Sequence, residues 1–247
     1  MAHYDDPQFS YTQYWQGREY EHLSEVLALN KLLQGLSFQK SADIGGGFGR
    51  LTPALAPRSP TTYLIEPSAK MRRLASKSLR SKNVEIMAGS AARTRLPDSS
   101  LDCAILVRVL HHIPNLQPIF SELTRILKPN GYLVIEFANS LNFKSRLKSF
   151  ISGEPIFPTP TDLRSLASIR KKYISFVNHH PQTVLKTLRL CRFAPLRVLS
   201  VSNFRSPLLK KIVPLQMLLL LESASQTIFS KIYFGPSIFI LAQKIAQ

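Results

Sequence analysis

The residue types best suited to chemistry gather in a glycine-rich segment, 43–49 (DIGGGFG), between an apolar stretch and a helical pattern. Glycines between a strand and a helix let the backbone turn sharply and come close to a ligand. The spacing of dinucleotide-binding loops is not met, because Arg50 stands where the third glycine or alanine belongs. Asp43, two residues before Gly45, is a poor neighbour for a pyrophosphate and suits a cation. The segment therefore predicts a binding loop for a positively charged ligand.

A second carboxylate, Glu66, follows the predicted strand 62–65. A carboxylate offers only acceptors, so it can hold both hydroxyls of a ribose. The alternative is an exposed charge at a strand end. Beside the glycine loop, Glu66 favours a site for an adenosine moiety.

Two histidine pairs are candidates for proton transfer. The pair 111–112 follows the predicted strand 101–107, at the carboxyl edge where open sheets bind ligands. Two roles are open for this pair. His112 could lie beside the substrate as a general base, or the pair could cap and pack the start of the following loop. The pair 179–180 precedes Pro181, which favours helix capping. The spacing of histidines, thiols and carboxylates predicts no metal site.

Strand and helix patterns alternate five times up to residue 138, which predicts a doubly wound, Rossmann-like α/β fold with a mostly parallel sheet. The expected strands are 41–44, 62–65, 84–87, 101–107, 132–138, 196–201 and 237–242. The expected helices cover 19–34, about 50 to 57, 68–80, 119–126 and 181–191, and a turn is expected at 128–131.

Two long excursions, 139–180 and 204–236, interrupt this rhythm and are expected to form helical caps with their own structure or function. In the first, residues 159–162 resemble a capping box, which predicts a helix through 169. Its apolar side chains are expected either to roof a pocket or to pack on one another.

The second excursion is expected to be largely helical over 208–234, with Pro214 near its start. Its apolar run 212–221 is too short to span a bilayer. Three interpretations stay open for this run: a buried core helix, a lipophilic tunnel, or a helix in a membrane interface beside two lysines.

The chain of 247 residues carries a net charge of +17, and its 45% hydrophobic content excludes a disordered protein. Residues 140–247 hold 16 basic and 3 acidic side chains. This charge suits an anionic substrate, a nucleic acid or an anionic membrane surface. Two cysteines give no disulfide framework, and the N-terminus lacks the pattern of a signal peptide, so we expect a cytoplasmic protein with membrane association as an addition.

Several motifs in order resemble the class I S-adenosylmethionine-dependent methyltransferases, nearest to the ubiquinone/menaquinone-biosynthesis-like group (methyltransferase type 11). The motifs are 43–49 (DIGGGFG), 64–68 (LIEPS), 89–91 (GSA), 96–102 (LPDSSLD), 109–112 (VLHH) and 127–131 (LKPNG). The resemblance covers 14–138 strongly and 178–247 loosely. It implies seven strands with the last one antiparallel. It also implies one methyltransferase domain over 1–247, in which 1–40 closes over the cofactor and 41–138 binds it.

The resemblance further implies S-adenosylmethionine as cofactor and assigns residues to it. The implied cofactor-binding residues are Tyr14, Arg18, Asp43, Gly45, Gly46, Gly47, Gly49, Glu66, Ser90, Ala91 and Val107. Trp15 belongs to the same N-terminal segment, and Arg18 would pair with the cofactor carboxylate. Ser90 departs from the family, which usually carries Asp there to accept from the adenine amino group.

The expected activity is methyl transfer by in-line displacement to a small-molecule or lipid-like acceptor, with His112 as the candidate base. The alternative is an RNA or protein methyltransferase that uses the basic C-terminal region. A dinucleotide oxidoreductase is disfavoured, since no Tyr-x-x-x-Lys pair occurs.

Overall fold

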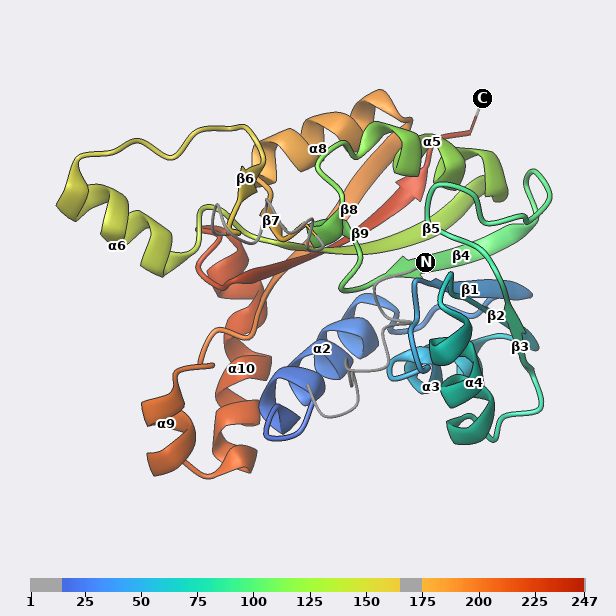
Figure 1. Cartoon of the computed structure of the whole chain (residues 1–247), viewed down its shortest axis with the longest axis horizontal. Coiled ribbons are helices and arrows are strands. Elements are labelled where there is room, and N and C mark those ends of the chain that lie inside the picture. Colours follow the sequence, from blue (N-terminus) through green and yellow to red (C-terminus); the bar gives the residue numbers. More distant parts are fainter. Residues whose placement is uncertain (1–14, 165–174, 247) are drawn as a thin grey trace.

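A seven-stranded sheet in the order β3-β2-β1-β4-β5-β9-β8 runs through the centre of the protein (Figure 1). The computed structural model describes residues 15–164 and 175–246. The strands are β1 (Lys40–Ile44), β2 (Thr61–Ile65), β3 (Val84–Met87), β4 (Leu101–Leu106), β5 (Leu127–Ala138), β8 (Phe193–Val201) and β9 (Ser237–Lys244). The first five pair in parallel, and β9 pairs antiparallel with both β5 and β8. The predicted fold is confirmed, and the antiparallel last strand, β9, lies between β5 and the edge strand β8.

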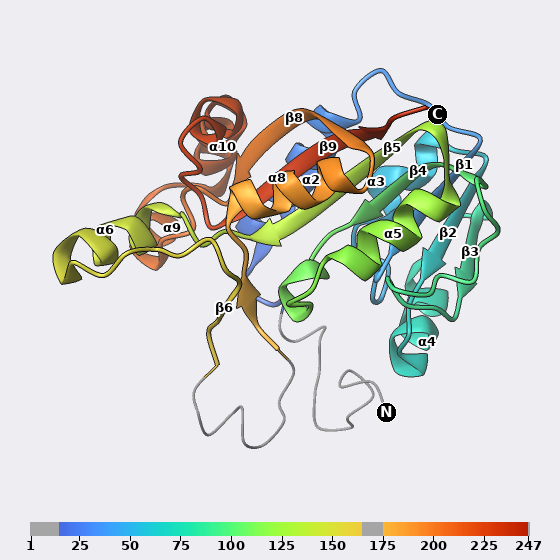
Figure 2. The ribbon, with the colours of Figure 1, turned by 90° about the horizontal axis from the view of Figure 1, so that it is seen from above.

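Helices cover both faces of the sheet (Figures 1 and 2). On one face lie α5 (Gln117–Ile126) and α8 (Pro181–Leu190). On the other lie α2 (Glu19–Leu32), α3 (Thr52–Leu55), α4 (Ala69–Ser78) and α10 (Leu215–Ser230), with short 3-10 turns η2 (Ala56–Arg58) and η3 (Leu110–His112) in the connections. Apolar side chains of these helices, such as Phe120, Leu188 and Leu29, are fully buried against the sheet. The two resulting core layers fix the strand ends that carry the site.

The turn predicted at 128–131 lies within the bounds of β5, as an irregularity of its pairing. Leu127 pairs with Leu101 of β4 and Tyr132 pairs with Cys103, so residues 128–131 have no partner in β4. The pairing register shifts before Cys103, and Asn130 takes a left-handed conformation with φ 62°. The strand therefore absorbs a local irregularity where the Pro-Asn-Gly composition indicated a break.

The first excursion contains a helix and a small hairpin. Helix α6 (Phe143–Ser152) begins where the Asn142 side chain accepts from the Ser145 amide at 3.1 Å. Strand β6 (Thr161–Asp162) pairs antiparallel with β7 (Val177–Asn178). The helix predicted from the 159–162 capping box is thus wrong in its described part, because this cross-strand pairing takes the residues that would begin it. Residues 165–174, which hold the rest of that prediction, lie outside the described residues.

The second excursion forms α9 (Pro207–Ile212) and α10, separated at Pro214, as expected. The core-helix interpretation of 212–221 is wrong, because Ile212 and Leu220 are 69% and 71% exposed. Instead α10 turns its polar residues inward, and Glu222 is fully buried. None of the helices in the described ranges is long and apolar enough to cross a membrane.

Candidate functional site

The carboxyl ends of β2, β1 and β4 lie side by side, which brings the glycine loop, Glu66 and Val107 to one edge of the sheet. The loop needs its glycines. Gly45 has φ 73°, its amide donates to the Ile65 carbonyl at 2.7 Å, and any side chain there would collide with Val109. A Cβ on Gly46 would lie 2.8 Å from the carboxyl carbon of Asp43. Gly47 and Gly49 also have positive φ. The loop is therefore a bare backbone surface open to a close ligand.

The carboxyl group of Asp43 lies beneath this loop and is only 2% exposed. The Thr52 hydroxyl, from the first residue of α3, donates to its Oδ2 at 2.7 Å. Burial raises the pKa of Asp43 to about 6, although the hydrogen bond from Thr52 and the charge of Arg50 act in the opposite direction. A cation at the loop would restore the charged carboxylate.

Glu66 is 4% exposed, so the interpretation as an exposed strand-end charge is wrong. Its Oε2 accepts from the Gly47 amide at 3.1 Å and its Oε1 from the Ser68 amide at 2.9 Å. Burial raises its pKa, while these two amide bonds lower it. The carboxylate is therefore fixed over the glycine loop with lone pairs still available for hydroxyl donors.

The adenine-side candidates follow β3. Ser90 and Arg93 exchange two backbone hydrogen bonds of 3.0 Å, which form a tight turn with Ala91 buried inside it. The Glu66 amide donates to the Met87 carbonyl at 3.1 Å, so this turn starts beside the end of β2. Val107, directly after β4, is also buried. The structure thus brings most of the residues selected from the sequence to one edge.

A hollow of about 30 Å³ remains at this edge. It is lined by Asp43, Gly45, Gly46, Gly47, Arg50, Leu51, Val107 and Arg108. The Arg50 guanidinium stacks on Trp15, 3.6 Å from the ring centroid, and Arg108 lies 5.3 Å from the same ring. Arg50 also pairs with the buried Glu25. Two guanidinium groups therefore close one end of the site and suit a carboxylate ligand.

Sequence reasoning missed Arg50 and Arg108 as site residues. The position of Arg50 directly after the glycine loop could have identified it as a site residue. The left-handed conformation of Arg108, with φ 63°, cannot be predicted from the sequence pattern. Arg18 precedes α2 as its N-cap residue and does not line the hollow. Tyr14 lies outside the described residues.

The histidines cluster beyond the end of β4. His111 is buried, its ring centroid lies 3.9 Å from that of His112, and burial, then the charge of His112, lowers the pKa of His111 well below its usual range. Nδ1 of His112 lies 2.8 Å from the Ser175 carbonyl. His180 is the N-cap residue of α8, but its side chain makes no capping hydrogen bond, so capping by that side chain is a wrong prediction. In the described ranges, no group of three His, Cys, Asp or Glu side chains could hold a metal ion.

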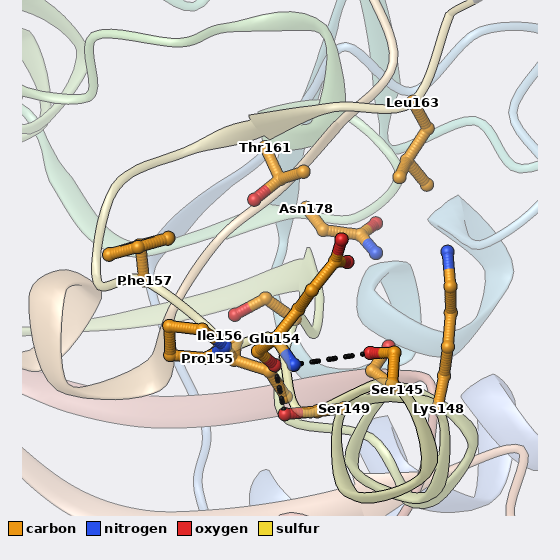
Figure 3. A pocket seen from close by; sticks show the side chains of 12 residues that line it. Ser145, Lys148, Ser149, Glu154, Pro155, Ile156, Phe157, Thr161, Leu163 and Asn178 are labelled. Carbon is orange, nitrogen blue, oxygen red and sulfur yellow. Dashed lines mark hydrogen bonds between the residues drawn. The ribbon is translucent and has the colours of Figure 1, made fainter.

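A larger hollow of about 560 Å³ lies between α6 and the chain that leads into β6 (Figure 3). Its walls mix the apolar side chains of Ile156, Phe157 and Leu163 with Lys148 and Asn178. Ser140, just after β5, also lines it, and its buried hydroxyl has no hydrogen-bond partner among the described residues. This hollow can take a ligand with both an apolar and a polar part.

The sequence and the fold are similar to those of known methyltransferases. Residues 42–135 match the family model described as a methyltransferase domain. The ubiquinone biosynthesis O-methyltransferase of Cupriavidus pinatubonensis is 30% identical over 128 residues, which cover 50% of this chain and 51% of that protein. A demethylmenaquinone methyltransferase of Tropheryma whipplei is 27% identical over 140 residues, covering 51% of this chain and 58% of that protein. The chain thus spans little more than half the length of these curated relatives.

A SAM-dependent methyltransferase from Thermotoga maritima has the same fold, with a TM-score of 0.62, 19% identity, and coverage of 95% of this chain and 94% of that one. Residues 42–135, which hold the glycine loop and its two buried carboxylates, therefore match a methyltransferase domain, and the chain has the fold of a solved SAM-dependent methyltransferase. This family match and this fold imply S-adenosylmethionine as the cofactor.

Proposed function

We propose that the protein transfers a methyl group from S-adenosylmethionine to a small-molecule or lipid-like acceptor by in-line displacement. The observation that carries this proposal is the pair of buried carboxylates, Asp43 and Glu66, at a bare glycine loop. The cofactor supplies an activated methyl group on a sulfonium, so the protein has chiefly to align donor and acceptor and to exclude water.

The residues present fit this cofactor chemically. Glu66 would accept from the ribose hydroxyls, and Asp43 would face the positively charged amino acid end. Arg50 and Arg108 would hold the carboxylate, the role that the sequence assigned to Arg18. Ser90, Ala91 and Val107 would border the adenine and the sulfonium. The hollow of about 30 Å³ lies among Asp43, Arg50 and Arg108, the residues that would face the amino acid end of the cofactor.

Two observations support a small or lipid-like acceptor. The larger hollow beside α6 joins apolar walls to Lys148 and Glu154, and it can hold the remote part of an amphiphilic acceptor, since it shares no lining residue with the hollow at the glycine loop. The curated relatives are named for ubiquinone and demethylmenaquinone. The basic C-terminal region keeps RNA or protein as the second candidate.

His112 is our proposed general base for an acceptor that carries a proton. The Ser175 carbonyl can accept a hydrogen bond only from a protonated Nδ1, so the neutral ring would keep Nε2 as its basic nitrogen. His112 lies in η3, directly after β4, at the edge that carries the cofactor site.

Labelling identifies the acceptor class. The purified protein and S-adenosylmethionine with a tritiated methyl group are added to a cell extract, which is then extracted with organic solvent. We expect label in the solvent phase, and His112→Gln should reduce the label while it leaves cofactor affinity unchanged. Label that stays with RNA or protein would favour the second candidate and overturn the small-molecule proposal.

Cofactor affinity should depend on pH through Asp43. A cationic ligand favours the charged carboxylate, so binding should be strong above pH 6 and weaken below it, by at most about tenfold per pH unit. Thr52→Val removes the hydroxyl that favours the charged form and should move this fall to higher pH. Calorimetry from pH 5 to 8 tests both expectations. A profile that Thr52→Val leaves unmoved would contradict this role for Asp43.

A further inference from the structure

Helix α10 is amphipathic in the opposite sense to an ordinary surface helix. Its inward side carries Glu222, Ser225 and Gln226, all buried, whereas Met217, Leu220 and Ile228 are more than half exposed. The Tyr20 hydroxyl of α2 donates to Glu222 at 2.6 Å, and the amides of the turn after β8 donate to the same carboxylate. These bonds fix the rotation of α10, so Leu220 and Leu221 are exposed while Leu218 is buried on the inward side.

Two further helices present apolar side chains at the same end of the molecule. On α9, Leu208 and Ile212 are 65% and 69% exposed, and on α6, Phe150 and Ile151 are 87% and 76% exposed. In both Figure 1 and Figure 2, α6, α9 and α10 lie toward one end of the protein, the end at which β5 finishes. We use the name apolar end for the exposed apolar residues of these three helices, which are Phe143, Leu147, Phe150, Ile151, Leu208, Leu209, Ile212, Leu215, Met217, Leu220, Leu221 and Ile228. A single exposed leucine needs no explanation, but an apolar surface on three helices marks an interaction site.

The charges around the apolar end select its partner. Lys144 and Lys148 of α6 and Lys211 of α9 are exposed among the apolar side chains. Neither α6 nor α9 contains an acidic residue, and the single acidic residue of α10, Glu222, is buried. Glu154, two residues after α6, is an exposed acidic side chain, so these three lysines still outnumber it. Apolar side chains with a rim of lysines are the composition of helices that lie in the interface of an anionic membrane.

We propose that the apolar end docks on an anionic phospholipid bilayer, with α6, α9 and α10 in the headgroup region. The apolar side chains enter the acyl boundary, and the lysines contact the lipid phosphates. The hollow is lined by residues of α6, one of the helices of the apolar end, so docking would place it near the bilayer surface (Figure 3). Delivery of a lipid-like acceptor from the bilayer into that hollow rests on the proposed function, whereas the docking itself does not.

Vesicle flotation of the full chain tests the docking. We expect the protein to float with vesicles of phosphatidylcholine and phosphatidylglycerol, to float much less with phosphatidylcholine alone, and to be released by about 0.5 M salt if the lysines dominate. The double variant Ile212→Gln, Leu220→Gln should weaken binding to the mixed vesicles at least about tenfold, because two exposed apolar anchors are lost.

The matched control is Leu190→Gln at the end of α8, which removes a side chain of similar exposure (74%) away from the apolar end. It should leave flotation unchanged. No flotation of the wild type, or equal flotation of the double variant, would overturn the proposal. So would a dimer by light scattering that the double variant separates, since the apolar end would then bind a second copy. Cofactor binding measured without vesicles keeps a failure of docking distinct from a failure of the proposed methyl transfer.

Discussion

Gly47→Arg should abolish measurable binding of S-adenosylmethionine, with affinity reduced about a hundredfold or more. Gly47 is buried in the loop, has φ 58°, and its amide donates to Glu66. An arginine there requires a left-handed conformation that costs a side-chain-bearing residue roughly 1–2 kcal/mol. Gly47 lines the hollow between the loop and Val107, so a long side chain there would compete with the cofactor for this space.

Gly35→Arg is the matched control. Gly35 follows α2 with φ 76°, is exposed, and a Cβ there would meet nothing within 4 Å. The backbone cost is thus similar in the two variants, and only Gly47→Arg obstructs the cleft. Thermal unfolding should show that both variants are slightly destabilised. Calorimetry should show that Gly35→Arg binds the cofactor and Gly47→Arg does not. If Gly47→Arg does not fold, Glu66→Gln tests the same site, since it keeps the shape and removes one ribose acceptor. Normal affinity in Glu66→Gln would contradict the assignment.

The cofactor half of the fold was predictable because its signals are local. The glycine loop, the apolar strands on either side and the carboxylates at two strand ends lie within short stretches of chain. The strand order of a doubly wound sheet then places them together. By contrast, Arg50 and Arg108 reach the site through contacts with Trp15 and Glu25, which come from another part of the chain. No spacing in the sequence encodes such a contact.

The second half was harder to predict because its environment is set by distant partners. The apolar run 212–221 fits a core helix by composition alone. The orientation of α10 depends on Tyr20, 202 residues earlier in the chain, and on backbone amides after β8. In the same way, Thr161 and Asp162 of the apparent capping box at 159–162 pair with β7, which lies beyond the end of the predicted helix. Hydrophobic periodicity in the sequence predicts a helix or a strand, but tertiary contacts determine which side of that helix or strand is buried.

Glu222→Leu should lower the free energy of unfolding by about 3–5 kcal/mol, because three buried donors lose their acceptor. The carboxylate is fully buried and accepts from Tyr20 at 2.6 Å and from the amides of Ser202 and Asn203 at 2.8 and 2.9 Å. A leucine leaves these donors buried without acceptors, at about 1–3 kcal/mol each. Urea denaturation of the variant and the wild type measures the difference.

A double-mutant cycle with Tyr20→Phe separates lost hydrogen bonds from altered packing. In the double variant no tyrosine hydroxyl is left unsatisfied, so its cost should be about 1–2 kcal/mol smaller than the sum of the two single costs. Additive costs would contradict the network. Because Glu222 and Leu220 lie on opposite sides of α10, the carboxylate that holds this helix against α2 also keeps Leu220 exposed. The stability of the fold and the composition of the apolar end therefore depend on the same buried group.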